Sequence, residues 1–238
     1  MSLSVLQTRD QIDKDRAELK RRGLSFLAPA WKVFLARWGL NDGLLLGDPI
    51  KSWDLLKSLD FFEKNLAKDD PILDLGAYAS EILPALHALG FNKLGGVDLN
   101  PKLAEMPHPG EISYTIGDFM KTPLPDGSMA AVTSTSVIEH GFDGERLLDE
   151  SARLLRPGGY FIASFDYWPE KLDTSGIEIF DMSWTIFSRE EIEDFIARAA
   201  TRGFKPVGAL EFDGKDKVID CLDRRYTFAW LALRKDVA

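Results

Sequence analysis

The chain has 238 residues, of which 45% are hydrophobic and 28% charged, a balance typical of a globular protein with one large α/β domain. Its formal net charge of −9 argues against nucleic acid as a partner, because nonspecific affinity for phosphate backbones comes mainly from Lys and Arg. The single cysteine, Cys221, excludes an internal disulfide and a cysteine-rich metal site, so we expect a cytoplasmic protein.

The N-terminal part of the chain has the composition of helices. Residues 4–22 and 30–40 both show helical patterns, and no apolar run reaches the roughly 20 residues that span a bilayer. The second of these helices mixes aromatic with basic residues, which suits either a membrane surface or a lid packed on the main domain, and we favour the lid. We therefore expect residues 1–50 to form a helical extension or lid and residues 51–238 to form the main domain.

After a third expected helix near residues 52–67, short apolar runs alternate with helical segments, which predicts a parallel sheet. Five of these runs are ILDL, LGGVDL, ISYTIGD, AAVTSTS and GGYFIASF. Two more, PVGALEF and RRYTFAWLALRK, follow the last helix with no helix between them, so we expect an antiparallel pair. The predicted fold is a doubly wound, Rossmann-like α/β sheet of seven strands, mostly parallel, with an antiparallel terminal strand and additional N-terminal helices.

The stretch PILDLGAYAS carries an apolar strand into a turn and then a helix, and ligands in doubly wound folds bind at such strand ends. Repeated glycines usually let the backbone approach the ligand there, but this turn has only Gly76, with Asp74 beside it. Asp98 ends the second strand about 20 residues further on, where an acid accepts hydrogen bonds from both ribose hydroxyls. The alternative for Asp98 is a helix cap, because Asn100 and Pro101 follow.

Polar groups also follow the third and fourth strands. Asp118 can accept a hydrogen bond from the amino group of an adenine while Phe119 packs against the ring, although a simple Gly-Asp turn is an equally good interpretation. After the fourth strand, Ser134, Thr135 and Ser136 lead into the sequence VIEHG.

Five motifs occur along the chain in this order: ILDLG, GGVDLN, IGDFM, LPDGSMAAVTSTSVIEHG and LLRPGGYFIAS. Together with the terminal strand pair they resemble the motifs of class I S-adenosylmethionine-dependent methyltransferases, especially the small-molecule branch, over roughly residues 50 to 235. The resemblance implies a seven-stranded sheet with an antiparallel seventh strand, and S-adenosylmethionine as cofactor.

By position, the resemblance also implies which residues hold the cofactor. The turn at Gly76 and the end of the fourth strand would lie beside the methionine part, the end of the second strand beside the ribose, and the end of the third beside the adenine. The implied cofactor-binding set is Asp74, Gly76, Ala77, Tyr78, Ser80, Asp98, Leu99, Asp118, Phe119, Thr135 and Ser136.

The turn departs from the family pattern, because Tyr78 and Ser80 stand where the second and third glycines usually are. Either the loop keeps its ligand at a slightly wider approach, with Ser80 as a hydroxyl donor or helix cap, or the site has decayed. We favour a retained site, because S-adenosylmethionine has no pyrophosphate for bare backbone to cradle.

His140 is the candidate general base for a hydroxyl acceptor, since it follows a strand at the cofactor end and an imidazole titrates near neutrality; a structural role is equally open. Glu139 is a candidate for substrate binding, for orienting a cofactor amine, or for capping the next helix. The long segment after the fifth strand is a further candidate for substrate binding or, equally, a packed loop that shields the domain's end. Its candidate platform for a sugar or another polar ring consists of Asp166, Tyr167, Trp168 and Trp184.

The sequence therefore predicts an S-adenosylmethionine-dependent methyltransferase that acts on a small-molecule or glycan acceptor, expected to be a hydroxyl, without a metal ion. A non-catalytic binding or scaffold protein of the same fold, with a degenerate cofactor loop, is the alternative. A nicotinamide-binding enzyme is disfavoured because the glycine fingerprint is missing.

Overall fold

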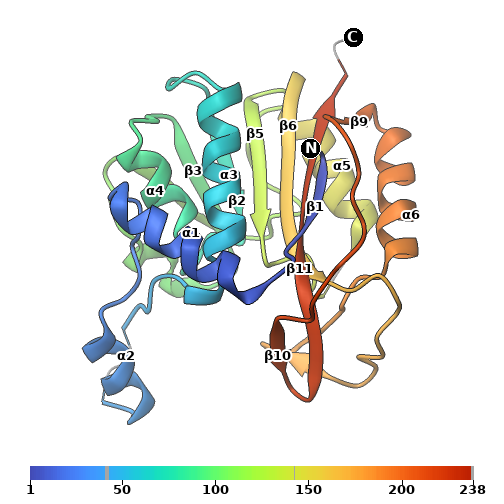
Figure 1. The fold of residues 1–238 in the computed structure, drawn as a ribbon. Helices are drawn as coiled ribbons and strands as arrows, with labels where there is room; N and C mark the ends of the chain where they lie inside the picture. The colour runs from blue at the N-terminus through green and yellow to red at the C-terminus, as the bar shows by residue number, and fades with distance from the viewer. Residues whose placement is uncertain (41–42, 142, 237–238) are drawn as a thin grey trace.

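The computed structural model describes residues 1–40, 43–141 and 143–236. At its centre five strands pair in parallel in the order β4-β3-β2-β5-β6 (Figure 1). Each strand arises from one of the expected apolar runs, so the parallel sheet is confirmed. Because the order reverses beside β2, the carboxyl ends of these strands border one crevice. The strands are β2 (Ile72–Leu75), β3 (Leu94–Asp98), β4 (Ile112–Ile116), β5 (Met129–Thr135) and β6 (Leu155–Tyr167).

The antiparallel edge differs in detail from the prediction. Strand β11 (Arg224–Lys235) pairs antiparallel with β6, as expected, from Thr227 to Arg234. The strand expected at 206–212 is only β9 (Phe204–Pro206), whereas β1 (Leu3–Val5) at the N-terminus pairs with the middle of β11. A further short strand, β10 (Ile219–Cys221), extends the far end. The expectation of a purely helical N-terminal extension is therefore wrong at β1, whose three residues are all buried.

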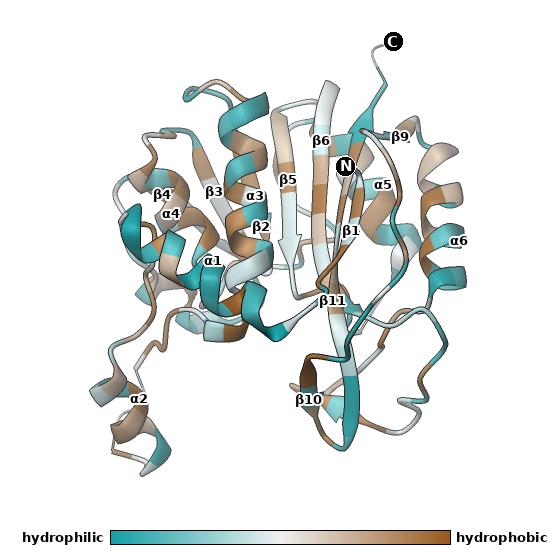
Figure 2. Ribbon diagram, viewed as in Figure 1, coloured by the Kyte–Doolittle hydropathy of each residue, from teal (hydrophilic) through white to brown (hydrophobic). Residues whose placement is uncertain are grey.

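Helices cover both faces of the sheet (Figure 1). Two apolar cores result, one on each face, and Figure 2 shows apolar residues concentrated where strands and helices meet. Capping boxes begin α1 at Thr8 and α6 at Ser188, the second of which the sequence predicted. The helices are α1 (Arg9–Arg21), α3 (Ser52–Asn65) and α4 (Ile82–Ala88) on one face, and α5 (Gly144–Leu154) and α6 (Arg189–Ala200) on the other.

Three short elements lie at the carboxyl edge of the sheet and shape the site. They are the 3-10 helices η1 (Pro49–Lys51) and η2 (Pro101–Glu105), and a hairpin formed by β7 (Glu178–Ile179) and β8 (Met182–Ser183). The hairpin is held to the end of β5, because the Thr185 amide donates to the Glu139 carbonyl at 2.8 Å and the Gly141 amide donates to the Ser183 carbonyl at 2.9 Å.

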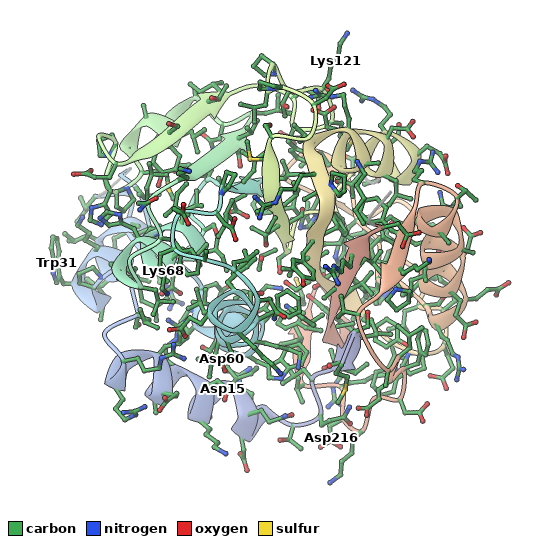
Figure 3. All side chains as sticks on the ribbon, turned by 90° about the horizontal axis from the view of Figure 1, so that it is seen from above. Asp15, Trp31, Asp60, Lys68, Lys121 and Asp216 are labelled. Carbon is green, nitrogen blue, oxygen red and sulfur yellow. The ribbon has the colours of Figure 1, made fainter. Side chains whose placement is uncertain are left out.

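Helix α2 (Ala30–Arg37) stands away from the sheet and has no buried residue (Figure 1). Trp31, Phe34 and Trp38 expose 60%, 60% and 68% of their surface, and Figure 3 shows Trp31 at the rim of the molecule. The interpretation of α2 as a packing helix is thus not supported by its burial. None of the described helices has the length and apolar character that crossing a bilayer requires.

Candidate active site

A cavity of about 1230 Å³ opens at the carboxyl ends of the parallel strands. Its walls come from the loops after β2, β3, β4 and β5, from the segment around η1, and from the β7–β8 hairpin. Nine of the predicted cofactor-binding residues line it together: Gly76, Tyr78, Ser80, Asp98, Leu99, Asp118, Phe119, Thr135 and Ser136.

The turn after β2 closes with a single glycine. Gly76 has φ +76°, and a Cβ atom there would lie 2.3 Å from a methyl carbon of Val137, so both the backbone and the packing require glycine. Ala79 takes the other left-handed conformation, with φ +61°, while neither Tyr78 nor Ser80 has a positive φ. The missing family glycines are therefore not needed for this backbone path.

Two of the predicted cofactor contacts lie beneath the turn rather than on the cavity wall. Ala77 is fully buried, and a Cβ atom on Gly96 of β3 would lie 2.7 Å from its side chain. Asp74 is 1% exposed, and within the described residues neither of its oxygens has a hydrogen-bond partner of good geometry. Burial raises the pKa of Asp74 well above its usual value, Ser80 partly opposes this, and Asp98 adds to it. Asp74 therefore lies buried beneath the turn, near Ser80 and Asp98, and is not among the residues that line the cavity.

Asp98 fastens the turn to the second strand end. One carboxylate oxygen accepts the Tyr78 amide at 3.0 Å, and the other accepts the Asn100 amide at 2.8 Å. The side chain that caps η2 is that of Asn100, which accepts the Lys102 amide at 2.9 Å. Asp98 is thus not the helix cap itself, and it presents a partly exposed carboxylate to the cavity.

Asp118 lies in a turn and also lines the cavity. It forms a turn, accepting the Met120 amide at 2.8 Å, and it pairs with Arg146 at 2.6 Å while lining the cavity. Partial burial raises the pKa of Asp118, but the Met120 amide and the Arg146 guanidinium outweigh it and leave the pKa lowered. Phe119 is half-buried beside it and packs against the core under α5.

At the end of β5, the backbone and two hydroxyls face the middle of the cavity. Ser136 has φ +55°, a conformation that is costly for a residue other than glycine, and its amide donates to the Ser164 carbonyl at 2.9 Å. The Thr135 and Ser136 hydroxyls are buried and have no hydrogen-bond partner among the described residues. Buried hydroxyls without partners are rare in folded proteins, and a polar ligand in the adjoining cavity would account for these two.

Beyond Ser136 the cavity is lined by a cluster of ionisable side chains. Glu139 is 1% exposed and Asp166 is 5% exposed, and the Lys51 ammonium lies 3.9 Å from Asp166 Oδ1 and 3.2 Å above the Phe228 ring. Burial raises the pKa of both carboxyls. Burial, with a smaller contribution from Lys51, lowers the pKa of His140 to about 4. His140 is therefore neutral near pH 7 and is a weaker base than the sequence indicated.

The predicted substrate platform is only partly assembled. Asp166 lines the cavity, and Trp184 lies behind it, donating its indole N–H to Asp166 Oδ2 at 2.7 Å. Tyr167 points to the other face of β6, where its hydroxyl donates to the Phe212 carbonyl at 2.9 Å. Trp168 lies outside the cavity with Lys217 4.7 Å above its ring. The period of two along a strand explains why Asp166 and Tyr167 cannot face the same site.

Sequence reasoning missed the contribution of the N-terminal segment. Lys51 and Ile50 of η1 line the cavity, as do Tyr226 and Phe228 of β11. No local pattern marks these positions, because they meet only when η1 and the far end of β11 fold over the strand ends.

A buried ion pair ties α1 to the cofactor turn. The Arg16 guanidinium donates to both oxygens of Glu81 at 2.9 Å, and Glu81 Oε1 also accepts the Phe26 amide at 2.7 Å. The Gly47 amide donates to the Ala79 carbonyl at 2.8 Å, so the N-terminal segment is fastened directly to the turn.

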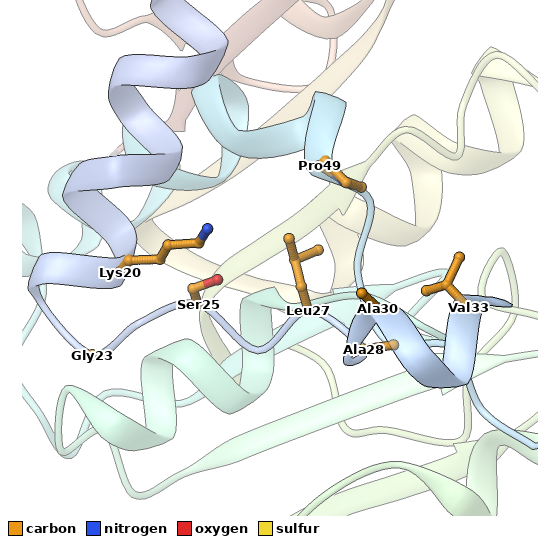
Figure 4. A pocket seen from close by; sticks show the side chains of 8 residues that line it. All are labelled: Lys20, Gly23, Ser25, Leu27, Ala28, Ala30, Val33 and Pro49. Atoms are coloured by element: carbon orange, nitrogen blue, oxygen red, sulfur yellow. The ribbon is translucent and has the colours of Figure 1, made fainter.

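A second cavity of about 630 Å³ lies between the end of α1 and α2 (Figure 4). Its wall is largely apolar, and Lys20 is the only ionisable side chain among its described lining residues. The chemistry therefore belongs to the first cavity. Among the described residues, no three His, Cys, Asp or Glu side chains are grouped so as to hold a metal ion.

The sequence of residues 73–163 matches the model of a methyltransferase domain. A probable S-adenosylmethionine-dependent methyltransferase of Mycolicibacterium smegmatis is 44% identical over 48 residues, which are 20% of this chain and 19% of that protein. Over this stretch the chain is similar to S-adenosylmethionine-dependent methyltransferases. It spans less than half the length of the curated relatives that it matches first, at 19%, 47% and 39%.

Solved structures of methyltransferases share the fold of this chain. A SAM-dependent methyltransferase of Methanosarcina mazei superposes with a TM-score of 0.57 at 14% identity, covering 75% of this chain and 98% of the other. A geranyl diphosphate C-methyltransferase of Streptomyces coelicolor, solved with Mg²⁺, geranyl diphosphate and S-adenosyl-L-homocysteine, gives 0.59 at 17% identity, covering 89% and 100%. At these identities the likeness concerns the fold.

The residues of the first cavity fit the family's cofactor. S-adenosylmethionine carries hydroxyls, an adenine and a charged methionine part, and the cavity offers a carboxylate at the second strand end, an aromatic ring at the third, and two unpaired hydroxyls at the fourth. The fit rests on this set of polar groups in one cavity.

Proposed function

We propose that this protein transfers a methyl group from S-adenosylmethionine to a small-molecule acceptor. The observation that carries the proposal is the single large cavity in which the cofactor turn, Asp98, Asp118 and the two unpaired hydroxyls after β5 meet. The match of residues 73–163 to a methyltransferase domain supports it. A decayed site is the less favoured alternative, because the turn keeps Gly76 and its hydrogen bonds to Val97 and Asp98.

We assign the cofactor-holding roles by the place of each side chain. Asp98 would accept from the ribose hydroxyls with its remaining lone pairs, and Asp118 with Phe119 would hold the adenine. Tyr78 and Gly76 would form the wall beside the methionine part, and the end of β5 would hydrogen-bond its polar groups. When bound, the cofactor supplies an activated methyl group on a sulfonium, so the chain's own tasks are alignment, exclusion of water and proton removal.

The acceptor would lie between the end of β5 and the cluster of Lys51, Glu139 and Asp166. We infer an acceptor with a hydroxyl group, and a glycan is one class that presents it. His140, neutral and with an unpaired buried Nδ1 among the described residues, would orient this hydroxyl. Residues 1–50 and the β7–β8 hairpin would cover the substrate, because both contribute lining residues on the open side of the cavity.

Titration calorimetry with S-adenosylhomocysteine tests the proposal. We expect saturable binding to the unchanged protein, a loss of about 1 kcal/mol or more for Asp98→Ala, and no change for Asp69→Asn, an exposed acid away from the cavity. No detectable binding at millimolar ligand would exclude the enzyme and favour a non-catalytic protein of this fold. A thermal shift with NAD in place of S-adenosylhomocysteine would instead favour a nicotinamide enzyme.

A further inference from the structure

Glu139 is a buried ionisable side chain in the wall of the cavity. It is 1% exposed and lines the cavity, yet its Oε2 atom has no hydrogen-bond partner among the described residues. Its backbone is fixed at the junction of β5 and the hairpin through the Thr185 amide. Such a carboxylate is positioned by the fold in the cavity wall, with one oxygen that no described residue engages.

The neighbouring carboxylates are already engaged. Asp166 accepts the Trp184 indole N–H and pairs with Lys51. Asp54, behind them on α3, accepts the Ser164 hydroxyl at 2.7 Å and the Leu55 amide at 3.0 Å. Of these three acids, Glu139 alone has an oxygen without a hydrogen-bond partner among the described residues. Two acids in different surroundings are the arrangement that divides acid and base roles.

The groups that face Glu139 set its proton affinity. Burial raises the pKa of Glu139 well above its ordinary value, Asp166 raises it further, Lys51 lowers it, and Asp54 raises it slightly. Tyr226 of β11 and His140 contribute no charge near neutrality, since burial raises the pKa of the first and lowers that of the second. A raised proton affinity makes the ionised form of Glu139 a stronger base than an ordinary glutamate.

We propose that Glu139 takes the proton from the nucleophilic atom of the methyl acceptor, so that the acceptor class is a hydroxyl or amine that arrives protonated, not a carboxylate or phosphate. This inference rests on the proposed methyl transfer. The acceptor's lone pair forms the bond to the methyl carbon, the bond from that carbon to sulfur breaks with its electron pair left on sulfur, and the acceptor's proton moves to Glu139 Oε2.

The test compares an acceptor that must lose a proton with one that has already lost it. The assay measures transfer of the tritiated methyl group from S-adenosylmethionine to each of two acceptors. The acceptors are phenol and 4-nitrothiophenol, which is ionised at pH 8. For Glu139→Gln we expect transfer to phenol to fall about a hundredfold, transfer to the thiolate to change by less than about threefold, and S-adenosylhomocysteine affinity to stay the same. Glu190→Gln, an exposed acid at the start of α6 outside the cavity, is the matched control and should leave all three unchanged.

A measurement without any acceptor provides the second arm. In protein labelled with ¹³C at glutamate carboxyls, the signal lost in Glu139→Gln should titrate at higher pH than the signal lost in Glu190→Gln, and Lys51→Met should raise its midpoint further. If neither probe is methylated, equal midpoints for these two signals would still overturn the proposal.

Three results would overturn the proposal: equal losses with both acceptors, weakened S-adenosylhomocysteine binding in Glu139→Gln, or a Glu139 midpoint equal to that of Glu190. Absence of S-adenosylhomocysteine binding in the unchanged protein is a different outcome, because it would contradict the proposed methyl transfer itself rather than the role of Glu139 within it.

Discussion

Glu81→Gln should destabilise the protein far more than the loss of an exposed ion pair. The Arg16–Glu81 pair is buried, with side chains 8% and 3% exposed, and is held by two hydrogen bonds of 2.9 Å. Removing one charge leaves the other buried and uncompensated, which typically costs about 3–5 kcal/mol. Arg16 keeps contacts to Ser52 and to the Asp48 carbonyl, so we expect a loss near the lower end, about 3 kcal/mol.

Urea unfolding and calorimetric melting measure this loss. For a chain of this length about 3 kcal/mol corresponds to a fall in Tm of roughly 6–12 °C. Glu193→Gln is the matched control, because its pair with Arg189 is about half exposed on both sides and should contribute about 1 kcal/mol at most. The double variant Arg16→Met, Glu81→Leu should recover much of the loss, since no unpaired charge stays buried.

The same variant should affect the cofactor turn. If Glu81→Gln loosens the contact of Gly47 with Ala79, the lost hydrogen bond is worth about 1 kcal/mol, or about fivefold weaker binding of S-adenosylhomocysteine. A stability loss equal to that of Glu193→Gln would refute the reasoning, because it would mean that α1 does not hold the turn through this pair.

Three further outcomes are expected. Gly76→Ala should cost at least about 2 kcal/mol in urea unfolding and more than Gly127→Ala, since both glycines have positive φ but only Gly76 faces a neighbour, Val137; equal costs would argue against the packing constraint. Ala79→Gly should raise stability by roughly 0.5–1 kcal/mol by relieving the left-handed φ of +61°, and a loss would contradict the strain. The pKa of His140 is lowered from 6.5 to about 4, so the unfolded chain binds its proton more tightly, and stability should fall as pH drops from about 6.5 toward 4. His140→Asn should flatten that part of the stability curve, and an unchanged slope would contradict the buried, neutral imidazole.

The sequence by itself determined the parallel sheet, because each strand is a short apolar run and its alternation with helices leaves few other arrangements. It also determined the positions of Gly76, Asp98 and Asp118, since the ends of parallel strands are found wherever the apolar runs stop. It also predicted the capping box at Ser188, because capping depends on two residues that are only three positions apart in the sequence.

Only the tertiary structure decided the rest. β1 enters the sheet although three residues carry no strand signal of their own, because the exposed edge of β11 supplies its hydrogen bonds. Tyr167 and Trp168 leave the cavity while Lys51 and Tyr226 enter it, which depends on strand faces and on segments more than 170 residues apart. The proton affinities of Glu139 and His140 were also beyond the sequence, since they follow from burial and from neighbours that only the fold brings together.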